Sequence, residues 1–396
     1  MAHEKIDAAL ETFYAGDTDG AEAALKEIGG GKLEAPAGLE PLDEAAYYEG
    51  IGGIQLARED AKGAAEAYKK MIELEAKGEA DANGHATSWA KLGEALAQTN
   101  ELEEAIEAFD KAVAMKTECE APTSSKLNVV YKYAECLFHG RKFQEAGAQF
   151  DNAIELAKEA GVDDGTMATL VLYRAESIKH KIGPMQASVR LQKGMDGVAP
   201  PPQLAALEAS LDVEFKQAVE LYRRAKELAA QANMPEEFQL QIQRSMSEAY
   251  HDAGRYVKGV MQRKKLIQMA EQQKVDPLEL GYMYHGLGES QREMGQVPEA
   301  IESYRKSLSH KAKAGADNVS LAKTQYSLGE CLAGGNKWDA AIEAFTKARD
   351  LEESSEAEDD NHKIRMKKYW NTLGMALQAS GKEEEGKAAI EKAESI

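Results

Sequence analysis

The sequence predicts an all-α fold, a solenoid built as one elongated array of about nine helical hairpins. Two observations lead to this prediction. Residues that favour helices dominate the composition, whereas the 396-residue chain has only 10 prolines and 8 phenylalanines. A pattern of small and large side chains also recurs about every 41 residues, and such a period is typical of repeat architectures. A hydrophobic content of 43% argues against intrinsic disorder. The repeat argues against the two or three separate domains that the length alone suggests.

The repeat is clearest in three segments. These are SWAKLGEALAQTNELEEAIEAFDKAV from Ser88, YHGLGESQREMGQVPEAIESYRKSL from Tyr284, and QYSLGECLAGGNKWDAAIEAFTKAR from Gln325. Each contains Leu-Gly in a first helix, a turn near Gly or Asn, and then alanine, an aromatic residue and a small residue at helical spacing. This pattern resembles the tetratricopeptide repeat family, which has Leu-Gly at positions 7 and 8 and an aromatic residue at position 24. The resemblance implies a right-handed solenoid of antiparallel helix pairs.

Eight repeats follow this frame. They begin at Ala45, Ala86, Leu127, Ala168, Leu240, Gly281, Ala322 and Lys367. Position 8 is small in all of them, as close contact between the paired helices requires. These residues are Gly52, Gly93, Ala134, Ala175, Ser247, Gly288, Gly329 and Gly374. Position 24 is aromatic or aliphatic except at Arg263, so we expect the repeat that begins at Leu240 to be degenerate or to pack differently there.

The frame divides the chain into four parts. Residues 1–44 are expected to form an N-terminal capping hairpin, and residues 45–181 hold tetratricopeptide-like repeats. Residues 182–212 are an insertion within a hairpin, and residues 213–396 hold further repeats and a C-terminal cap. Caps are needed because the end repeats present one polar face to water. The period exceeds the usual 34 residues by about two helical turns. Repeats of this length resemble those of kinesin light chain, which implies the architecture alone.

The insertion breaks the period, because the fourth and fifth repeats begin 72 residues apart. Gly194, Gly197 and the prolines at 200 to 202 mark a loop. Pro202 is expected to open a helix that runs into the second helix of the repeat. One hypothesis is that the insertion covers the groove or docks a partner. The alternative is a tolerated surface insertion, since long loops cost little entropy. The segment SSEAEDD at 354–360 is expected to form a solvated acidic turn.

In the family that the repeats resemble, the first helices line a concave surface through positions 2, 5, 6, 9, 12 and 13. Position 9 is Glu in six of the eight repeats, although only 68 of the 396 residues are acidic. These residues, called the Glu ladder below, are Glu94, Glu135, Glu176, Glu248, Glu289 and Glu330. One hypothesis is that the ladder binds basic side chains or backbone amides of an extended peptide. The alternatives are pairing with Lys and Arg between repeats, or simple inheritance of a residue that favours helices.

Aromatic and basic residues accompany the Glu ladder at the inward positions. The aromatic candidates for partner binding are Tyr131, Tyr173, Tyr282 and Tyr326, and the basic candidates are Lys91, Lys132 and Arg244. A mixed face of this kind suits a polypeptide better than a small anion. Members of the family that bind chaperone tails place Lys at position 5 and Asn at position 9. Here position 9 is mostly Glu and position 5 is never Lys, so that carboxylate clamp is absent.

Composition restricts the partner and the compartment. The formal net charge of -20 repels phosphate backbones and anionic lipid, so we expect neither a nucleic-acid nor a membrane partner. The first residues do not resemble a signal peptide, and no apolar run approaches 18 residues. Cys119, Cys136 and Cys331 fit no zinc, redox or disulfide pattern, which favours a cytoplasmic location.

No catalytic, cofactor or metal site is expected. GGGK at 29–32 lacks the spacing and the hydroxyl residue of a phosphate loop. DTDG at 17–20 lacks the carboxylates that a calcium loop needs at its first and last positions. The pair His251 and Asp252 has no evident further ligands, and the sequence spacing supports no Ser-His-Asp arrangement or activated cysteine.

The leading hypothesis is a non-enzymatic scaffold or adaptor that binds a peptide or helical segment, with a basic one favoured, in its concave groove. Replacing Glu135, Glu176 and Glu248 with glutamine is then expected to weaken binding of a basic partner. A second hypothesis is a structural protein that forms homo-oligomers or binds a cytoskeletal filament. A third is a peptide-sensing regulator, which ranks last because no basic helix-turn-helix precedes the repeats.

Overall fold

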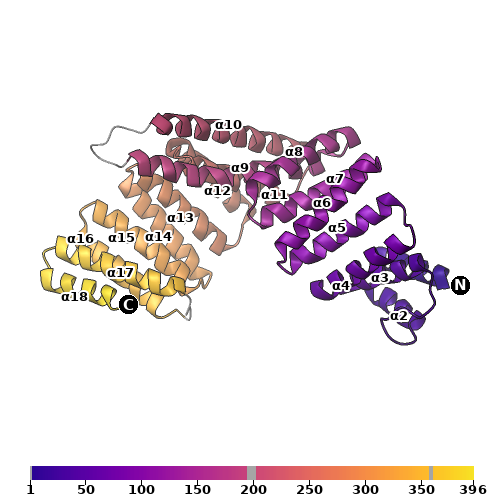
Figure 1. Ribbon diagram of the computed structural model, residues 1–396. Helices are drawn as coiled ribbons and strands as arrows, with labels where there is room; N and C mark the ends of the chain where they lie inside the picture. Colours follow the sequence, from indigo (N-terminus) through magenta and orange to yellow (C-terminus); the bar gives the residue numbers. More distant parts are fainter. Residues whose placement is uncertain (1, 194–201, 356–359) are drawn as a thin grey trace. The chain divides into compact units, whose positions relative to one another are not determined.

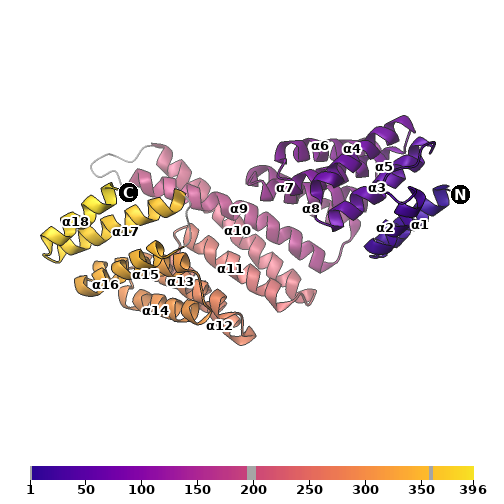
Figure 2. The same cartoon turned by 90° about the horizontal axis from the view of Figure 1, so that it is seen from below.

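The computed structural model describes residues 2–193, 202–355 and 360–396. Within these ranges the chain forms 18 helices and no strand (Figure 1). Among α1–α8 in one unit and α11–α18 in the other, consecutive helices pack together in pairs and each pair packs on the next, as Figures 1 and 2 show for the last three hairpins. The all-α solenoid of nine hairpins predicted from the sequence is therefore confirmed for the described residues.

The chain divides into two compact units. Unit 1 comprises Met1–Lys181 and Arg223–Ala232, and unit 2 comprises Ile182–Tyr222 and Asn233–Ile396. The hairpins of unit 1 are formed by Ala2–Tyr14 (α1), Thr18–Ile28 (α2), Pro41–Ala57 (α3), Ala61–Lys77 (α4), Ala82–Gln98 (α5), Leu102–Glu118 (α6), Thr123–His139 (α7) and Phe143–Ala160 (α8).

Two longer helices, Asp164–Lys193 (α9) and Pro202–Gln231 (α10), each contribute to both units. The remaining hairpins of unit 2 are formed by Glu236–Asp252 (α11), Tyr256–Gln273 (α12), Pro277–Glu293 (α13), Val297–Lys313 (α14), Asn318–Gly334 (α15), Trp338–Glu353 (α16), Asp360–Ala379 (α17) and Glu383–Glu394 (α18). The first boundary between the units falls at residue 182, where the sequence places the start of the insertion.

The insertion is largely helical. The first helix of its hairpin continues through Pro184 to Lys193, and the second begins at Pro202 as predicted. Both helices contain 30 residues, against 17 in α5 and α7. The loop residues expected at 194–201 lie outside the described residues, and so do residues 356–359 of the expected acidic turn.

Within unit 2, the added parts of α9 and α10 pack against α11, α12 and α13 of the following hairpins. Arg190 of α9 donates a hydrogen bond to Glu293 at 3.1 Å and lies over the ring of Tyr256, 5.5 Å from its centroid. On α10, the ring of Phe215 packs edge-on against Tyr250, with 5.1 Å between the centroids. The insertion therefore extends the packed surface of unit 2.

The hairpins share two turns, and both place one residue in the left-handed region of φ. Position 15 joins the two helices of a repeat and has positive φ at Glu59, Asn100, Arg141, Gly254, Gly295, Asn336 and Gly381. Position 35 joins one repeat to the next and has positive φ at Glu79, Glu120, Gly161, Asn233, Lys274 and Gly315. Because the same turns recur at the same positions, the helices α3–α8 and α11–α16 contain 16 to 18 residues each, and the 41-residue period is preserved outside the insertion.

Replacing Arg141 with glycine is expected to stabilise the protein by about 1 kcal/mol. Arg141 has a φ of 61°, which costs a residue with a side chain roughly 1–2 kcal/mol, and the greater freedom of glycine in the unfolded chain offsets part of that gain. Urea unfolding measures the change. The reverse substitution, Gly295→Ala, is the matched control, since φ is 72° and no atom lies within 4 Å of the new Cβ. It should destabilise, and loss of stability in Arg141→Gly would contradict this explanation.

In four hairpins the core contains the ring of position 24 packed against the glycine of position 8. A Cβ added to Gly329 at position 8 would lie 2.6 Å from the ring of Phe345 at position 24, and one on Gly288 would lie 2.8 Å from Tyr304. Both rings are buried. The close approach expected from the small residues at position 8 is thus confirmed. Arg263 packs differently, as predicted, and lies against α13 of the next hairpin.

Candidate functional site

The Glu ladder lies on the first helices α5, α7, α9, α11, α13 and α15. Two of its members form ion pairs between neighbouring repeats. Lys132 donates to Glu94 at 2.6 Å in unit 1, and Arg292 donates to Glu330 in unit 2. Lys91 likewise pairs with Glu49 of the preceding repeat, and it also bonds to the hydroxyl of Tyr14 at 2.9 Å. These contacts match the alternative in which the ladder pairs between repeats, and each contributes little where it is exposed.

Other members of the ladder have partners on their own helix. The hydroxyl of Tyr131 donates to Glu135 at 2.6 Å. Glu176 pairs with Lys179 at 2.8 Å and is only 9% exposed. Burial alone would raise the pKa of Glu289, but His285 and nearby Arg263 hold that pKa below its ordinary value.

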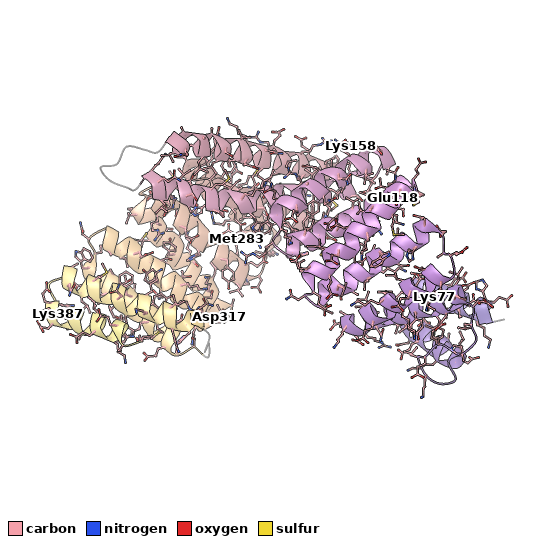
Figure 3. All side chains as sticks on the ribbon, in the orientation of Figure 1. Lys77, Glu118, Lys158, Met283, Asp317 and Lys387 are labelled. Atoms are coloured by element: carbon pink, nitrogen blue, oxygen red, sulfur yellow. The ribbon has the colours of Figure 1, made fainter. Side chains whose placement is uncertain are left out.

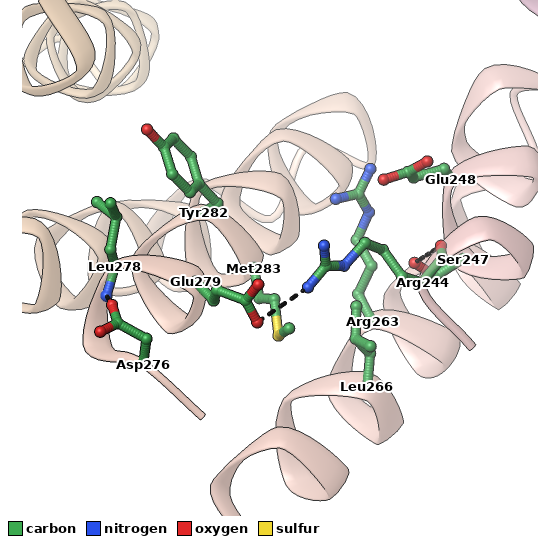
Figure 4. A pocket seen from close by; sticks show the side chains of 10 residues that line it. All are labelled: Arg244, Ser247, Glu248, Arg263, Leu266, Asp276, Leu278, Glu279, Tyr282 and Met283. Carbon is green, nitrogen blue, oxygen red and sulfur yellow. Dashed lines mark hydrogen bonds and ion pairs between the residues drawn. The ribbon is translucent and has the colours of Figure 1, made fainter. Parts of the chain in front are cut away.

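The ladder member Glu248 lies close to Arg263 (Figure 4). It adds to the negative field at this buried arginine. All six ladder residues therefore lie beside a polar or charged neighbour of this chain.

Two of the predicted tyrosines belong to an aromatic cluster in unit 1. The ring of Tyr173 stacks on that of Phe150, with 5.5 Å between the ring centroids, and meets Phe138 edge-on at 5.6 Å. The ring centroid of Tyr131 lies 6.5 Å from that of Tyr173. His180 stacks on Phe143 beside them at 4.1 Å. Burial and the neighbouring Glu135 raise the pKa of Tyr131, which keeps it protonated as a hydrogen-bond donor.

The candidates in unit 2 differ widely in exposure. Tyr282 is 49% exposed, whereas Tyr326 is 7% exposed and packs on Phe345. The ring of Tyr326 is therefore a core residue and faces little solvent. Arg244 is partly exposed and donates to Glu279 at 3.3 Å.

Two hollows of about 350 Å³ each flank α7 in unit 1. The first lies between α7 and α9, and its lining carries no charged side chain. It is lined by Ser124, Leu127, Asn128, Tyr131, Thr166, Thr169 and Leu170. The second lies between α5 and α7, and its polar lining consists of Glu94, Gln98, Asn100, Lys132, Glu135 and His139. The structure thus gathers Glu94, Lys132, Glu135 and Tyr131, four of the predicted site residues, around one helix.

Position 31, in the last turn of the second helix, carries buried charges that the sequence analysis does not identify. Lys116 is 1% exposed, and its ammonium group donates to Asn83, Thr87 and Ser125 at 2.6 to 2.9 Å. Lys311 is 2% exposed and donates to Thr324 at 2.9 Å. Lys116 of α6 thereby binds both α5 of its own hairpin and α7 of the next, and Lys311 of α14 binds α15, so both lysines join adjacent hairpins.

Glutamates occupy the same position in two other repeats. Glu75 accepts from His85 and Ser88, each at 2.8 Å. Glu352 is fully buried and accepts from Arg365 at 2.8 Å and from His362 at 3.0 Å.

Charged residues only two positions later, such as Lys77 and Glu118 in Figure 3, are exposed. The residue type alone therefore does not distinguish the buried position. The available signal is that position 31 is alanine in the other repeats: Ala157, Ala229 and Ala270.

His251 and Cys136, which the sequence analysis considered, lie in surroundings typical of structural residues. His251 bonds to the hydroxyl of Ser290 at 3.0 Å, and burial lowers its pKa. Burial raises the pKa of Cys136 to about 11, which disfavours the reactive thiolate. In the part of the chain that the structure describes, no three His, Cys, Asp or Glu residues gather as metal ligands. None of its helices there combines the length and apolar character needed to cross a bilayer.

Comparison with known proteins identifies the repeats. Family models of the tetratricopeptide repeat match residues 86–119, 279–354 and 367–396. None of the curated proteins is a detectable relative of the chain.

Several solved structures are similar to the chain at low sequence identity. BtubC (BKLC) from P. vanneervenii is 15% identical with a TM-score of 0.48, and the match covers 65% of this chain and 89% of that one. Aspartyl phosphate phosphatase F from Bacillus subtilis is also 15% identical with a TM-score of 0.48, over 100% and 93% of the two chains. Kinesin light chain-like repeats from Podosopora anserina are 16% identical with a TM-score of 0.40, over 54% and 95%. At these scores the likeness carries no information about function.

The matched segments include repeats predicted from Ala86, Gly281, Ala322 and Lys367, and the hairpins there have the expected helix pairs. In each of these repeats, the ring or aliphatic side chain at position 24 packs against the glycine at position 8. The matched segments are therefore tetratricopeptide-type repeats, within a chain that is an all-α repeat solenoid in its described residues.

Proposed function

We propose that the chain is a non-enzymatic protein-interaction scaffold that binds an extended peptide segment across α7 in unit 1. Repeats of this type generally serve protein interaction, so a protein or peptide is the expected class of partner. The observation that carries the proposal is the pair of hollows on either side of α7. Both open between neighbouring first helices, where a bound segment would contact several repeats at once.

The two hollows favour different side chains. The hollow between α7 and α9 has no charged lining residue and includes Leu127, Tyr131 and Leu170 in its lining, so it suits an apolar side chain. The hollow between α5 and α7 contains Glu94 and Glu135 with Lys132, an excess of one acid before histidine is counted. It therefore suits a basic side chain.

The spacing of the hollows defines the motif. Their linings centre about eight residues apart along α7, or about 12 Å at the helical rise per residue, and the hollows also lie on opposite sides of this helix, which is about 10 Å wide. The resulting separation is about 16 Å, which an extended peptide covers in about five residues. We therefore propose a partner with an apolar and a basic side chain about five residues apart.

Replacing both Glu94 and Glu135 with glutamine is expected to weaken peptide binding about tenfold, because the basic side chain loses its charged acceptors. Peptides are first selected on the full chain from a random display library and then measured by fluorescence polarisation. The matched control is the pair Glu107→Gln and Glu159→Gln, which makes the same charge change at exposed positions of second helices. Equal affinities for the two double variants, or selected peptides without the spaced pair, would contradict the proposal.

The substitutions suggested by the sequence alone are less suitable. Glu176 is almost buried and paired with Lys179, so its replacement disturbs a packed site. Glu248 belongs to unit 2. Of that set, Glu135 alone lines a hollow beside α7.

A further inference from the structure

A hollow in unit 2 follows from the loss of ring packing in one hairpin. Elsewhere, rings such as those of Tyr304 and Phe345 fill the space above the glycine at position 8. The hairpin of α11 and α12 has Ser247 and Arg263 at these positions. A hollow of about 540 Å³ opens between α11 and α13, and Arg263 and Leu266 of α12 contribute to its lining (Figure 4).

Arg263 is a buried cation with incomplete hydrogen bonding. It is 9% exposed, and its Nε–H has no hydrogen-bond partner among the described residues. Burial lowers its pKa, against the field of Glu289, Glu248 and Asp252. Buried polar groups are usually hydrogen-bonded, so an enclosed guanidinium of this kind indicates that an acceptor belongs nearby.

Gly286 provides the space for this guanidinium. A Cβ at residue 286 would lie 1.7 Å from Nη1 of Arg263, a distance that no side chain at this position permits. Glycine in the interior of a helix costs roughly 0.5–1 kcal/mol relative to alanine. The glycine at 286 therefore makes α13 less stable but leaves the space in which the guanidinium of Arg263 lies beside the hollow.

The rim of the hollow is polar and partly occupied by contacts within the chain. Arg244 pairs with Glu279 at 3.3 Å, and Asp276 accepts the N–H of Leu278 at 2.7 Å at the start of α13. Tyr282 is exposed beside them. Figure 4 shows Glu248 close to the guanidinium of Arg263, at the opposite side from Asp276.

These charges favour an uncharged ligand that both donates and accepts hydrogen bonds. A carboxylate would lie close to Glu248 and Glu279, and an ammonium group would lie close to Arg263 and Arg244. A carboxamide avoids both repulsions, because its oxygen accepts from a guanidinium and its NH₂ donates to a carboxylate. Leu266 and Met283 line the same hollow and suit the methylene groups of such a side chain.

We propose that this hollow binds a carboxamide side chain, asparagine or glutamine, of a polypeptide partner, between Arg263 and Glu248. The site lies in unit 2, so it goes beyond the peptide site proposed on α7 and does not depend on it. It assigns a role to the arginine that interrupts the repeat pattern.

The test uses the full chain labelled with ¹⁵N-arginine and the probe N-acetyl-glutamine methylamide. The Nε–H signal of Arg263, assigned by its loss in Arg263→Lys, is expected to shift and saturate at millimolar probe. N-acetyl-glutamate methylamide has the same shape with a charge, and N-acetyl-glycine methylamide has the same backbone without the side chain. Both should bind at least about tenfold more weakly, since a site that hydrogen-bonds one group discriminates strongly against its analogue.

Variants separate recognition from folding. Glu248→Gln keeps the size and shape of the side chain and leaves the guanidinium in place but removes the repulsive charge, and circular dichroism checks that the variant is folded. The preference for glutamine over glutamate is expected to fall at least threefold, a modest share of such discrimination. The exposed substitution Lys258→Gln on α12 is the control and should leave that preference unchanged. An unshifted Arg263 signal at saturating probe, equal binding of the glutamate or glycine probe, or an unchanged preference in Glu248→Gln would overturn the proposal.

Discussion

Replacing Gly329 with valine is expected to destabilise unit 2 by about 3 kcal/mol, in the upper part of the range for overpacked cores. The reason is the contact between α15 and α16, where even one added carbon would lie 2.6 Å from the ring of Phe345. That ring is 1% exposed, so it cannot turn out into solvent without losing its burial. Urea unfolding followed by circular dichroism measures the change.

The matched control for this substitution is Gly183→Ala. Gly183 also lies inside a helix, but no atom is within 4 Å of its added Cβ. This variant should gain roughly 0.5–1 kcal/mol from the better helix former. A second test combines Gly329→Val with Phe345→Leu, and the smaller side chain should restore part of the stability through non-additivity. Independent, additive effects of the two substitutions would show that the ring and the glycine are not coupled.

The second large effect concerns pH and the buried Lys311. Burial lowers its pKa to about 8, with a partial offset from Asp317. An unfolded lysine has a pKa of about 10.4. Between these two values the unfolded chain binds more protons than the folded one, so the contribution of Lys311 to stability rises with pH. Below pH 8 both states are protonated and the full penalty for burying the charge is present.

Lys311→Met removes this titration while filling similar space. The stability of the variant relative to the natural chain is therefore expected to fall by about 3 kcal/mol between pH 7 and pH 10.5, the free energy of a shift of more than two units. Unfolding curves at several pH values measure this difference. Lys313→Met, at an exposed position of the same helix, should parallel the natural chain. A pH-independent difference for Lys311→Met would contradict the assignment.

The fold was predictable because the residues that determine helix pairing recur at the same positions of most repeats. Leu-Gly at positions 7 and 8 and the ring at position 24 set the helix pairing, and the same turns recur after a fixed number of residues. The continuation of α9 was less predictable. Gly183 and Pro184 both disfavour the interior of a helix, yet contacts such as that between Arg190 and Glu293 of α13 fix the segment within unit 2.

The site was predictable only in part. The frame identifies which residues belong to the first helices, and Glu94, Tyr131, Lys132 and Glu135 do line hollows. It does not reveal how deeply each side chain is covered by the next hairpin, which is why Tyr326 is a core residue while Tyr282 is exposed. Contacts between neighbouring repeats determine how exposed each side chain is, and the sequence pattern of a single repeat does not describe those contacts.

The buried charges at position 31 bear on how such a chain is able to evolve. Lys116 needs the hydroxyls of Thr87 and Ser125, whereas Glu75 needs the donors of His85 and Ser88. Recombination that exchanged hairpins would bring an ammonium group to a junction built for a carboxylate. Although the hairpins share one backbone plan, the paired residues at these junctions restrict which hairpin can follow which. Shuffled or duplicated arrays would fold stably only where both partners of a junction were exchanged together.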